Sequence, residues 1–267
     1  MKKFIKVIAI LSAAALLAVS LSACSATTGK LSKIQKNGTI VVYTDPNFYP
    51  FEFPGPDGID GVDIQIGREI AADLGVTLTI QEANFDAIIM SLKGGKGDIA
   101  ISGMTITDER KESIDFSIPY INSIQYIILR EDSDIKIMED LAGKKIGVAM
   151  GYTGSFIIDD ELNEDGSLYG TGASSTPYPS AMEASLDLLN GKVEAVIMDE
   201  YVAKNIVAKN AGLKTFELAN ADGVVSAEEY GVVVPKGNKD LLDRINGVLT
   251  QINAQNKVEQ WVLEFSE

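Results

Sequence analysis

The chain has 267 residues, 46% of them hydrophobic and 23% charged, which is an ordinary composition for a folded protein of one large or two modest domains. Its formal net charge of -15 argues against nucleic acids and anionic membrane surfaces as partners, because both are negatively charged. The sequence has no histidine, which excludes Ser-His-Asp and Cys-His catalysis and histidine metal sites. It also lacks a P-loop and a complete EF-hand loop, so we expect neither a metal nor a cofactor.

The N-terminus is typical of an exported protein. Lys2 and Lys3 precede an apolar run over residues 7–21. This run is short for a membrane-spanning helix and has the length of a signal-peptide core. We therefore expect a signal peptide over residues 1–23.

Cys24 is the only cysteine, so an intramolecular disulfide is impossible. The sequence Leu-Ser-Ala-Cys over 21–24 resembles a bacterial lipobox, which implies cleavage before Cys24 and a lipid on its sulfur. Ordinary cleavage that leaves a free thiol is the alternative. With the lipid, residues 24–36 are a tether, and the protein is extracytoplasmic, anchored to the cell membrane or periplasmic.

Strand-like and helix-like patterns alternate after the tether, and each half of the chain has the same order of patterns. Apolar runs and helical spacing predict strands at 38–44, 76–80, 145–150 and 193–199 and helices at 61–75, 85–95, 153–163, 180–191 and 200–212. This alternation predicts an α/β fold with mostly parallel strands.

A long β-prone run over 118–132 connects the two halves, and a return near 226–238 leads into two helices over 241–256 and 257–265. We expect two lobes, each with a mixed sheet and flanking helices, joined by two strands that act as a hinge. The expected boundaries are 37–122 with 228–267 for lobe 1 and 123–227 for lobe 2.

A short internal repeat supports equivalent halves. The sequence Gly-Lys-Gly-Asp-Ile-Ala-Ile at 95–101 matches Gly-Lys-Val-Glu-Ala-Val-Ile at 191–197. Each copy follows a predicted helix, so the segments after them, 102–105 and 198–201, are expected at equivalent carboxyl ends of strands. Ligands of open α/β sheets bind at those ends.

Arg110 is in an unusual place for a cation. Thr107 is a predicted N-cap, and a positive charge in the first turn of a helix is unfavourable. One interpretation is a solvated ion pair with the neighbouring acidic residues. The other is an anion receptor beside the small residues Gly103 and Thr105.

Four further positions have both a structural and a functional interpretation. Thr153 and Asp199 are each expected to begin a helix, where they cap it or hold an anionic and an ammonium group respectively. Phe48 follows the first strand, and Phe85 starts a helix. These two rings belong to the core or lie on either side of an aliphatic ligand group.

The segments in this order resemble the family 3 extracellular solute-binding proteins, the amino-acid receptors of bacterial ABC importers, over nearly all of the mature chain. The similarity is carried by Tyr-Pro-Phe-Glu-Phe at 49–53 and by the segments 60–75, 85–120, 150–155 and 191–199. Residues 103–111 are especially similar to the glutamine-binding member, and the overall pattern is that of glutamine- and histidine-binding proteins. The resemblance implies the two-lobed type II periplasmic-binding-protein fold.

The resemblance also implies the ligand-binding residues: Asp45, Phe48, Phe85, Gly103, Thr105, Arg110, Met150, Thr153 and Asp199. Arg110 is placed on the ligand α-carboxylate, and backbone groups around Gly103, Thr105 and Thr153 assist it. Asp199 is placed on the α-ammonium group. The two phenylalanines flank the ligand side chain, and Asp45 reaches toward its polar end.

Two methionines depart from the glutamine-binding pattern. Met150 and Met198 replace basic or polar residues near the ligand, which argues against glutamine and indicates a less polar or adaptable pocket. The C-terminal sequence also lacks the usual Trp-Phe-Gly ending.

The sequence therefore predicts a monomeric, lipid-anchored receptor that binds a free L-amino acid between two lobes and delivers it to an ABC transporter permease, without a reaction. Two alternatives stay open. One is an enzyme of the same fold, of the cyclohexadienyl dehydratase type, with Glu200 as the nearest candidate acid. The other is an amino-acid sensor domain, which requires further domains.

Overall fold

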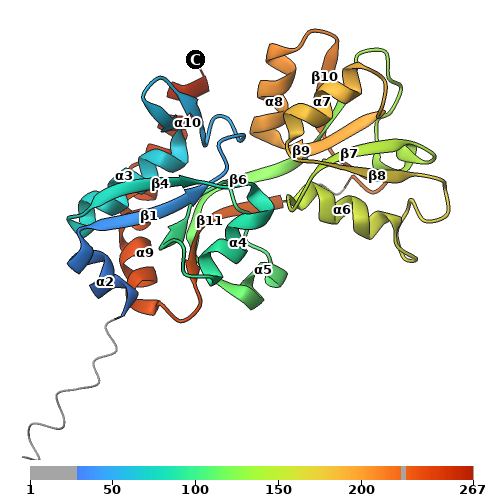
Figure 1. Ribbon diagram of the computed structural model, residues 1–267. Helices are drawn as coiled ribbons and strands as arrows, with labels where there is room; N and C mark the ends of the chain where they lie inside the picture. The colour runs from blue at the N-terminus through green and yellow to red at the C-terminus, as the bar shows by residue number, and fades with distance from the viewer. Residues whose placement is uncertain (1–28, 224–226, 267) are drawn as a thin grey trace, which may run out of the picture.

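The structure is a computed structural model that describes residues 29–223 and 227–266 (Figure 1). The expected signal peptide, Cys24 and the start of the tether lie outside these residues. Within the described ranges, no helix combines the length and the apolar character needed to cross a membrane.

Helices and strands alternate through most of the chain, as predicted. The helices are α2 (Lys30–Asn37), α3 (Val62–Leu74), α4 (Phe85–Lys93), α5 (Asp108–Ser113), the 3-10 helix η1 (Met138–Leu141), α6 (Thr153–Leu162), α7 (Ala181–Leu189), α8 (Glu200–Lys209), α9 (Lys239–Ala254) and α10 (Lys257–Ser266). The strands are β1 (Thr39–Thr44), β2 (Phe53–Gly55), β3 (Gly58–Asp60), β4 (Thr77–Glu82), β5 (Ile99–Ala100), β6 (Ile114–Arg130), β7 (Lys145–Ala149), β8 (Ser174–Tyr178), β9 (Ala195–Asp199), β10 (Leu213–Glu217) and β11 (Ala227–Pro235).

One of these helices lies in the segment that was expected to be a tether. Residues 30–36 belong to α2, whose Ile34 is 2% exposed and packs into the core. Lys30 pairs with Asp98 at 3.3 Å. Residues 30–36 are therefore an ordered helix packed on the core, and the expectation of a flexible tether over them is wrong.

The strands form one continuous sheet, in the order β4-β1-β5-β11-β6-β9-β7-β8, with β10 also on β6 and a separate β2-β3 hairpin. The expectation of two separate sheets is therefore wrong. β6 is 17 residues long and connects the two groups of strands. Residues 114–124 of β6 pair with β11, and residues 125–130 pair with β9 and β10.

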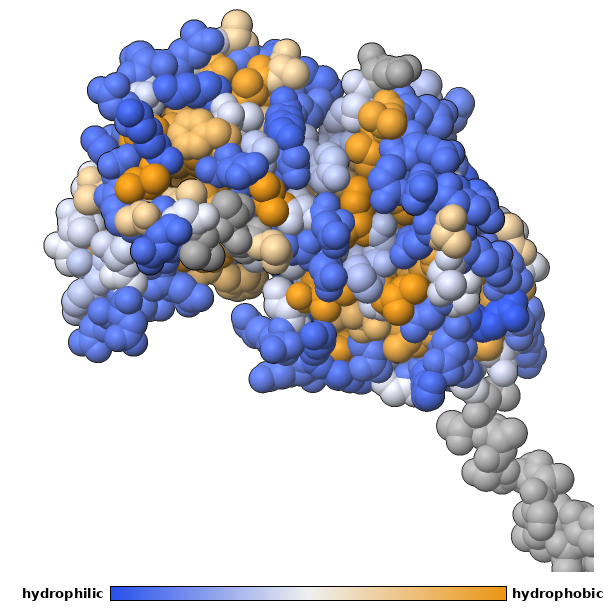
Figure 2. Space-filling view, turned by 180° about the vertical axis from the view of Figure 1, so that it is seen from behind, coloured by the Kyte–Doolittle hydropathy of each residue, from blue (hydrophilic) through white to orange (hydrophobic). Residues whose placement is uncertain are grey.

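The molecule consists of two bodies joined along β6 and β11 (Figure 1). We call the part with α2–α5, α9, α10 and β1–β5 the first body, and the part with α6–α8 and β7–β10 the second body. Seen from behind, the junction of the two bodies is notched at its lower edge, and hydrophilic residues cover most of the surface (Figure 2).

The internal repeat corresponds to a repeated arrangement of strands. β1 lies between β4 and β5, all parallel, and β7 lies between β8 and β9, again all parallel. Asp98 accepts a hydrogen bond from the Val41 N–H at 2.9 Å, and Glu194 accepts one from the Lys145 N–H at 2.7 Å. The acid of each repeat copy thus binds the backbone of the central strand of its own body.

The helices cover the sheet with their apolar faces. The predicted stripe of α3, consisting of Val62, Ile66, Ile70 and Leu74, is buried and faces the core. One core cluster extends from the first body across the junction into the second, and a smaller cluster lies within the second body. The bodies are therefore packed together, which brings the strand ends of both to the junction.

Candidate ligand-binding site

The candidate residues lie at the carboxyl ends of equivalent strands. Asp45 follows β1, and the loop 102–105 follows β5. In the second body, the loop 150–152 follows β7, and Asp199 ends β9. The Thr153 and Thr105 hydroxyls hydrogen-bond across the junction at 3.0 Å. The two halves of the predicted site thus meet.

Arg110 is a buried cation that contacts both bodies. Thr107 caps α5 as predicted, because its Oγ1 accepts the Arg110 N–H at 3.2 Å. The Arg110 side chain is turned inward, and the residue is 6% exposed. Its guanidinium donates to the carbonyl of Thr105 at 2.7 Å and to the carbonyl of Gly151 at 2.9 Å.

The surface ion pair that was the alternative for Arg110 is not formed. Asp108 pairs with Lys111 at 3.0 Å, and Arg110 forms no ion pair within residues 29–223 and 227–266. Burial lowers the pKa of Arg110, whereas the nearby carboxylate of Asp199 acts in the opposite direction. The guanidinium therefore retains donors and positive charge for an anion.

Asp199 occupies the N-cap position of α8 but does not cap it with its side chain. It is 2% exposed and accepts a hydrogen bond from the Tyr230 hydroxyl at 2.7 Å. The carboxylate of Asp199 therefore does not cap the helix, which was its predicted structural role. The carboxylate is a buried anion at the junction.

Glu228 is a buried acid beside Asp199 that sequence analysis did not select. It accepts hydrogen bonds from the Thr105 hydroxyl at 3.2 Å and from the Gln125 side chain at 3.1 Å. Burial, followed by the charge of Asp199, raises the pKa of Glu228 to about 9. This raised pKa keeps Glu228 protonated at neutral pH.

Gly103 is required by the close approach of an aromatic ring. Its φ of +51° suits glycine, and a Cβ there would lie 2.2 Å from Cε1 of Phe48. The Gly103 N–H donates to Asp63 at 2.7 Å. This N–H therefore supports the loop and does not donate to a ligand carboxylate. The remaining hydrogen-bonding group of the Gly103 backbone is its carbonyl, an acceptor that suits an ammonium group.

Two more buried acids hold this loop from beneath. Glu52 accepts a hydrogen bond from the Ser102 hydroxyl at 2.7 Å, and that hydroxyl accepts the Asp45 N–H at 3.0 Å. Burial raises the pKa of Asp63 to about 6, and burial together with Asp63 raises the pKa of Glu52 well above its usual value. These acids fix the positions of Asp45 and residues 102–103.

The two predicted aromatic residues are buried on the first body. Phe48 is 1% exposed and Phe85 is 5% exposed. The Phe85 N–H donates to the carboxylate of Asp45 at 3.1 Å, and the guanidinium of Arg110 lies 5.4 Å from the Phe85 ring centroid. Both rings stack on Tyr152, a residue of the second body that was not selected from the sequence.

The two methionines differ in their exposure. Met150 is 37% exposed, in contrast to the buried acids and rings around it. Met198 is 2% exposed within β9, where it is in register with Tyr126 of β6. The proposed contact of Met150 with the ligand remains a prediction.

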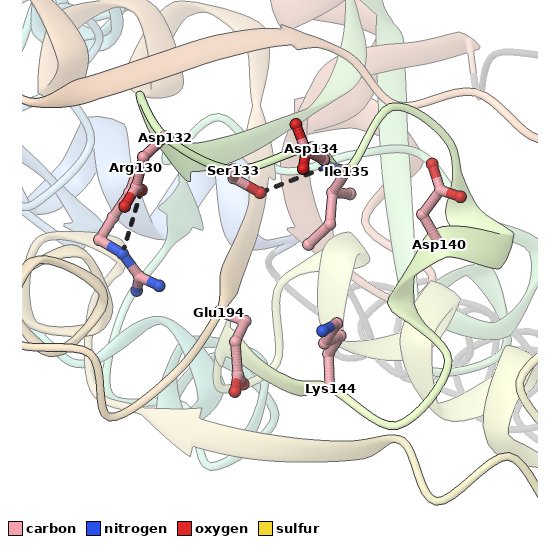
Figure 3. A pocket seen from close by; sticks show the side chains of 8 residues that line it. All are labelled: Arg130, Asp132, Ser133, Asp134, Ile135, Asp140, Lys144 and Glu194. Atoms are coloured by element: carbon pink, nitrogen blue, oxygen red, sulfur yellow. Dashed lines mark hydrogen bonds and ion pairs between the residues drawn. The ribbon is translucent and has the colours of Figure 1, made fainter.

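The surface has two hollows of interest, and only the smaller one borders the site residues. A hollow of about 200 Å³ borders the cluster and includes Phe85, Arg110, Gly151 and Phe156 in its lining. A larger hollow of about 390 Å³ lies in the second body and is lined by Arg130, Asp132, Ser133, Asp134, Ile135, Asp140, Lys144 and Glu194 (Figure 3). Arg130 is paired there with Asp132 at 3.6 Å, so its charge is already balanced.

Comparisons with known proteins identify the family of the chain. Residues 40–265 match the model of the bacterial extracellular solute-binding proteins, family 3. The chain belongs to this family. The match includes both bodies and the candidate residues, from Asp45 to Glu228.

Individual members of the family are similar along most of their length. The L-cystine-binding protein TcyJ of Escherichia coli (strain K12) is 30% identical over 234 residues, which cover 86% of this chain and 84% of that protein. A mutant of ArgBP from T. maritima has a TM-score of 0.79 and 37% identity, with 89% of this chain and 100% of that chain covered. A Streptococcus pneumoniae amino acid ABC transporter substrate-binding protein bound to L-arginine has a TM-score of 0.79 and 30% identity, with 89% and 98% covered.

Three functional candidates escaped sequence analysis. Tyr152 lies inside the segment 150–155, but only its neighbours were considered. Glu228 and Tyr230 lie on the predicted return strand, where Glu228 is followed directly by Glu229 and three valines follow Tyr230 and Gly231. This pattern does not indicate which of the two glutamates points toward Asp199.

The first prediction concerns the proton on Glu228. The folded protein holds this proton up to a pH of about 9, whereas an unfolded chain releases it near the ordinary value of 4.5. The contribution of Glu228 to stability is therefore greatest below pH 4.5 and is lost as the pH rises toward 9. Glu228→Gln keeps the shape of the neutral acid, so we expect the free energy of unfolding to fall less steeply with pH, by up to about 1.4 kcal/mol for each pH unit.

Denaturant unfolding of both proteins between pH 5.5 and 8 measures this difference. Glu229→Gln is the matched control, because the neighbouring Glu229 is exposed on the same strand. Equal slopes for wild type and Glu228→Gln would show that Glu228 is ionised in the folded protein.

Proposed function

We propose that this solute-binding protein captures a free L-amino acid as a zwitterion and delivers it to an ABC importer. The observation that carries the proposal is the buried guanidinium of Arg110, which forms no ion pair within the described residues and is influenced by the charge of the buried Asp199. A guanidinium binds a carboxylate with two parallel hydrogen bonds. The relatives are described as binding cystine or arginine, which supports an amino acid as the ligand.

The α-carboxylate of the ligand is bound by Arg110 with help from the second body. Thr153 begins α6, and its hydroxyl already points at Thr105. The first turn of α6 contains no acidic residue, so the positive end of the helix dipole is available to an anion. The carboxylate is thus bound by groups from both bodies.

The α-ammonium group is bound by Asp199. Because Glu228 is protonated, the two acids together carry one negative charge, which balances one ammonium group. The Tyr230 hydroxyl fixes the orientation of Asp199. A ligand with one negative and one positive charge therefore places each charge beside an opposite charge of the site.

The two bodies act as lobes that open and close. Lobe 1 comprises residues 37–122 and 228–267, and lobe 2 comprises residues 123–227, with β6 and β11 as the hinge. A zwitterion held by Arg110 of lobe 1 and Asp199 of lobe 2 makes contacts in the closed form that the open form lacks. Only such a difference in affinity can drive closure.

The protein is placed outside the cytoplasm by its family, and we propose that a lipid on Cys24 anchors it there. The apolar run over 7–21 and the sequence over 21–24 support this proposal. Cleavage before Cys24 leaves a short segment ahead of α2 as the tether. The monomeric receptor then delivers its ligand to the permease at the same membrane.

Binding rather than catalysis is the activity of this chain. The relatives are named as binding proteins. Glu200, the acid considered for a dehydratase, forms an ion pair with Lys204 one helical turn away. Glu200 therefore forms an ion pair on the surface of α8, and no observation supports a catalytic role for it.

The second prediction tests the zwitterion site. Arg110→Ala removes the partner of the ligand carboxylate inside a buried site, where such a loss costs roughly 2 to 5 kcal/mol. We expect the affinity for the best of the twenty amino acids to fall at least thirtyfold in calorimetry. Asp199→Asn should weaken all amino-acid ligands by a similar factor, because it acts on the α-ammonium group.

The matched control is Arg68→Ala. Arg68 is an exposed arginine of the first body that pairs with Asp60. Its replacement should leave binding unchanged. An Arg110→Ala protein that binds within a factor of a few of wild type contradicts the proposed site.

The third prediction concerns closure. Small-angle scattering should give a smaller radius of gyration at saturating ligand than without ligand, since the lobes approach each other. The same comparison with Arg110→Ala is the control, because a variant that cannot bind should not contract. Equal radii for the wild type in both conditions would indicate a site that forms without hinge motion.

The fourth prediction concerns the anchor. Cys24→Ser removes the only possible site for a thioether lipid, so the protein should move from the membrane fraction to the soluble or secreted fraction of an expressing bacterium. Ser22→Ala alters a neighbouring residue and keeps the cysteine, and it should remain with the membrane. An unchanged distribution of Cys24→Ser contradicts lipidation.

A further inference from the structure

Tyr152 lies where the ligand side chain is expected. Its ring stacks on Phe85 with the centroids 4.0 Å apart and on Phe48 with the centroids 5.7 Å apart, at interplanar angles of 24° and 30°. Within the described residues, Phe48 and Phe85 form no ring contact with each other. The Tyr152 ring therefore separates the two aromatic residues that were expected to flank a ligand.

The hydroxyl of Tyr152 also contacts Asp45, which was expected to bind the polar end of a ligand side chain. It donates to the Asp45 carboxylate at 3.3 Å, on the same oxygen that accepts the Phe85 N–H. The second Asp45 oxygen accepts a hydrogen bond from the Asn47 side chain at 2.7 Å. Stacking on two rings with a donor on Asp45 is the set of contacts that a long ligand side chain with a polar end would make.

The backbone holds Tyr152 firmly in this position. Its N–H donates to the Ala149 carbonyl at 3.3 Å, and its carbonyl accepts both the N–H of Ser155 at 3.0 Å and the hydroxyl of Ser155 at 2.8 Å. The preceding Gly151 accepts a hydrogen bond from Arg110. Tyr152 is 5% exposed, so rotating it outward costs the stacking, the hydroxyl bond and the burial of the ring together.

We propose that Tyr152 fills the side-chain subsite of the closed protein and restricts the ligand to amino acids with small side chains, such as glycine, alanine and serine. This proposal rests on the proposed function, because it assumes that Arg110 and Asp199 bind the α-groups. Tyr152 belongs to the second body and enters the subsite of the first body when the two close. A long side chain in the subsite would meet the ring and prevent closure, whereas a small one leaves room for both.

The experiment compares ligands of two sizes on wild type and on a variant with a smaller residue at position 152. Calorimetry on the wild-type chain should show that the tightest of glycine, L-alanine and L-serine binds at least tenfold more tightly than L-arginine and L-glutamine. Tyr152→Ala opens the subsite between Phe48 and Phe85. We expect this variant to bind L-arginine at least tenfold more tightly than wild type does, and the small ligands less tightly.

Two control variants separate the effect of size from other effects. Tyr152→Phe retains the ring and loses the bond to Asp45, so it should keep the preference for small ligands. Tyr169→Ala replaces a tyrosine of the second body that is 55% exposed and should change nothing. If Tyr152→Ala does not fold, Tyr152→Leu gives a smaller increase in space and the same direction of change.

The outcomes distinguish this proposal from the proposed function. A wild-type protein that binds L-arginine or L-glutamine as tightly as the small amino acids, through Arg110, overturns the role of Tyr152 and leaves the zwitterion site intact. A preference that is unchanged in Tyr152→Ala also overturns it. A wild-type protein that binds none of the twenty amino acids overturns both.

Discussion

The guanidinium of Arg110 is held by two backbone carbonyls that belong to different bodies, one from Thr105 and one from Gly151. A buried cation is costly unless an anion compensates it, and two neutral carbonyls compensate it only in part. The contact between the bodies therefore contains a positive charge that is only partly compensated. A ligand carboxylate compensates this charge at the point where the bodies meet. Ligand binding is thereby coupled to the relative position of the two bodies.

The protein is strongly acidic, and yet its site is electrically balanced. Burial achieves this balance by keeping protons on acids that would otherwise be ionised, Glu228 beside Asp199 and the pair of Glu52 and Asp63 beneath the loop. These neutral or half-neutral groups serve as hydrogen-bond partners for Thr105, Ser102 and the backbone of Gly103. A site with one available anion and one available cation recognises the charge pattern shared by all free amino acids, and selection among them is left to the side-chain subsite.

Much of the fold follows from local patterns in the sequence. Period 3.6 in α3, glycines after helices, and short apolar runs before residues such as Asp199 predict elements that the structure confirms, because these patterns reflect burial of one helix face or of a whole strand. The joining of the strands into one sheet was not predicted. The single sheet arises because the two ends of β6 pair with different strands. Strand pairing joins residues that are far apart in the sequence, so no local pattern specifies it.

The candidate site was predicted only in part. The positions of Arg110 and Asp199 at the starts of helices did not distinguish a structural role from a functional one, and the resemblance to the family selected them. Tyr152 and Glu228 were missed for a common reason. Their importance comes from a neighbour more than 25 residues away in sequence, Asp45 for the tyrosine and Asp199 for the glutamate, and such a neighbour becomes visible only when the bodies are placed together.

The sheet order makes the first body depend on segments that are far apart in the chain. The second body is built from a continuous stretch of chain, whereas β5 of the first body pairs with β11, which lies more than 120 residues later, and α9 packs on α3. Contacts of such separation form slowly, because closing a long loop costs entropy before the contact is gained. The first body, although it contains β1, therefore cannot be completed until β11 and α9 have joined it from the far end of the chain.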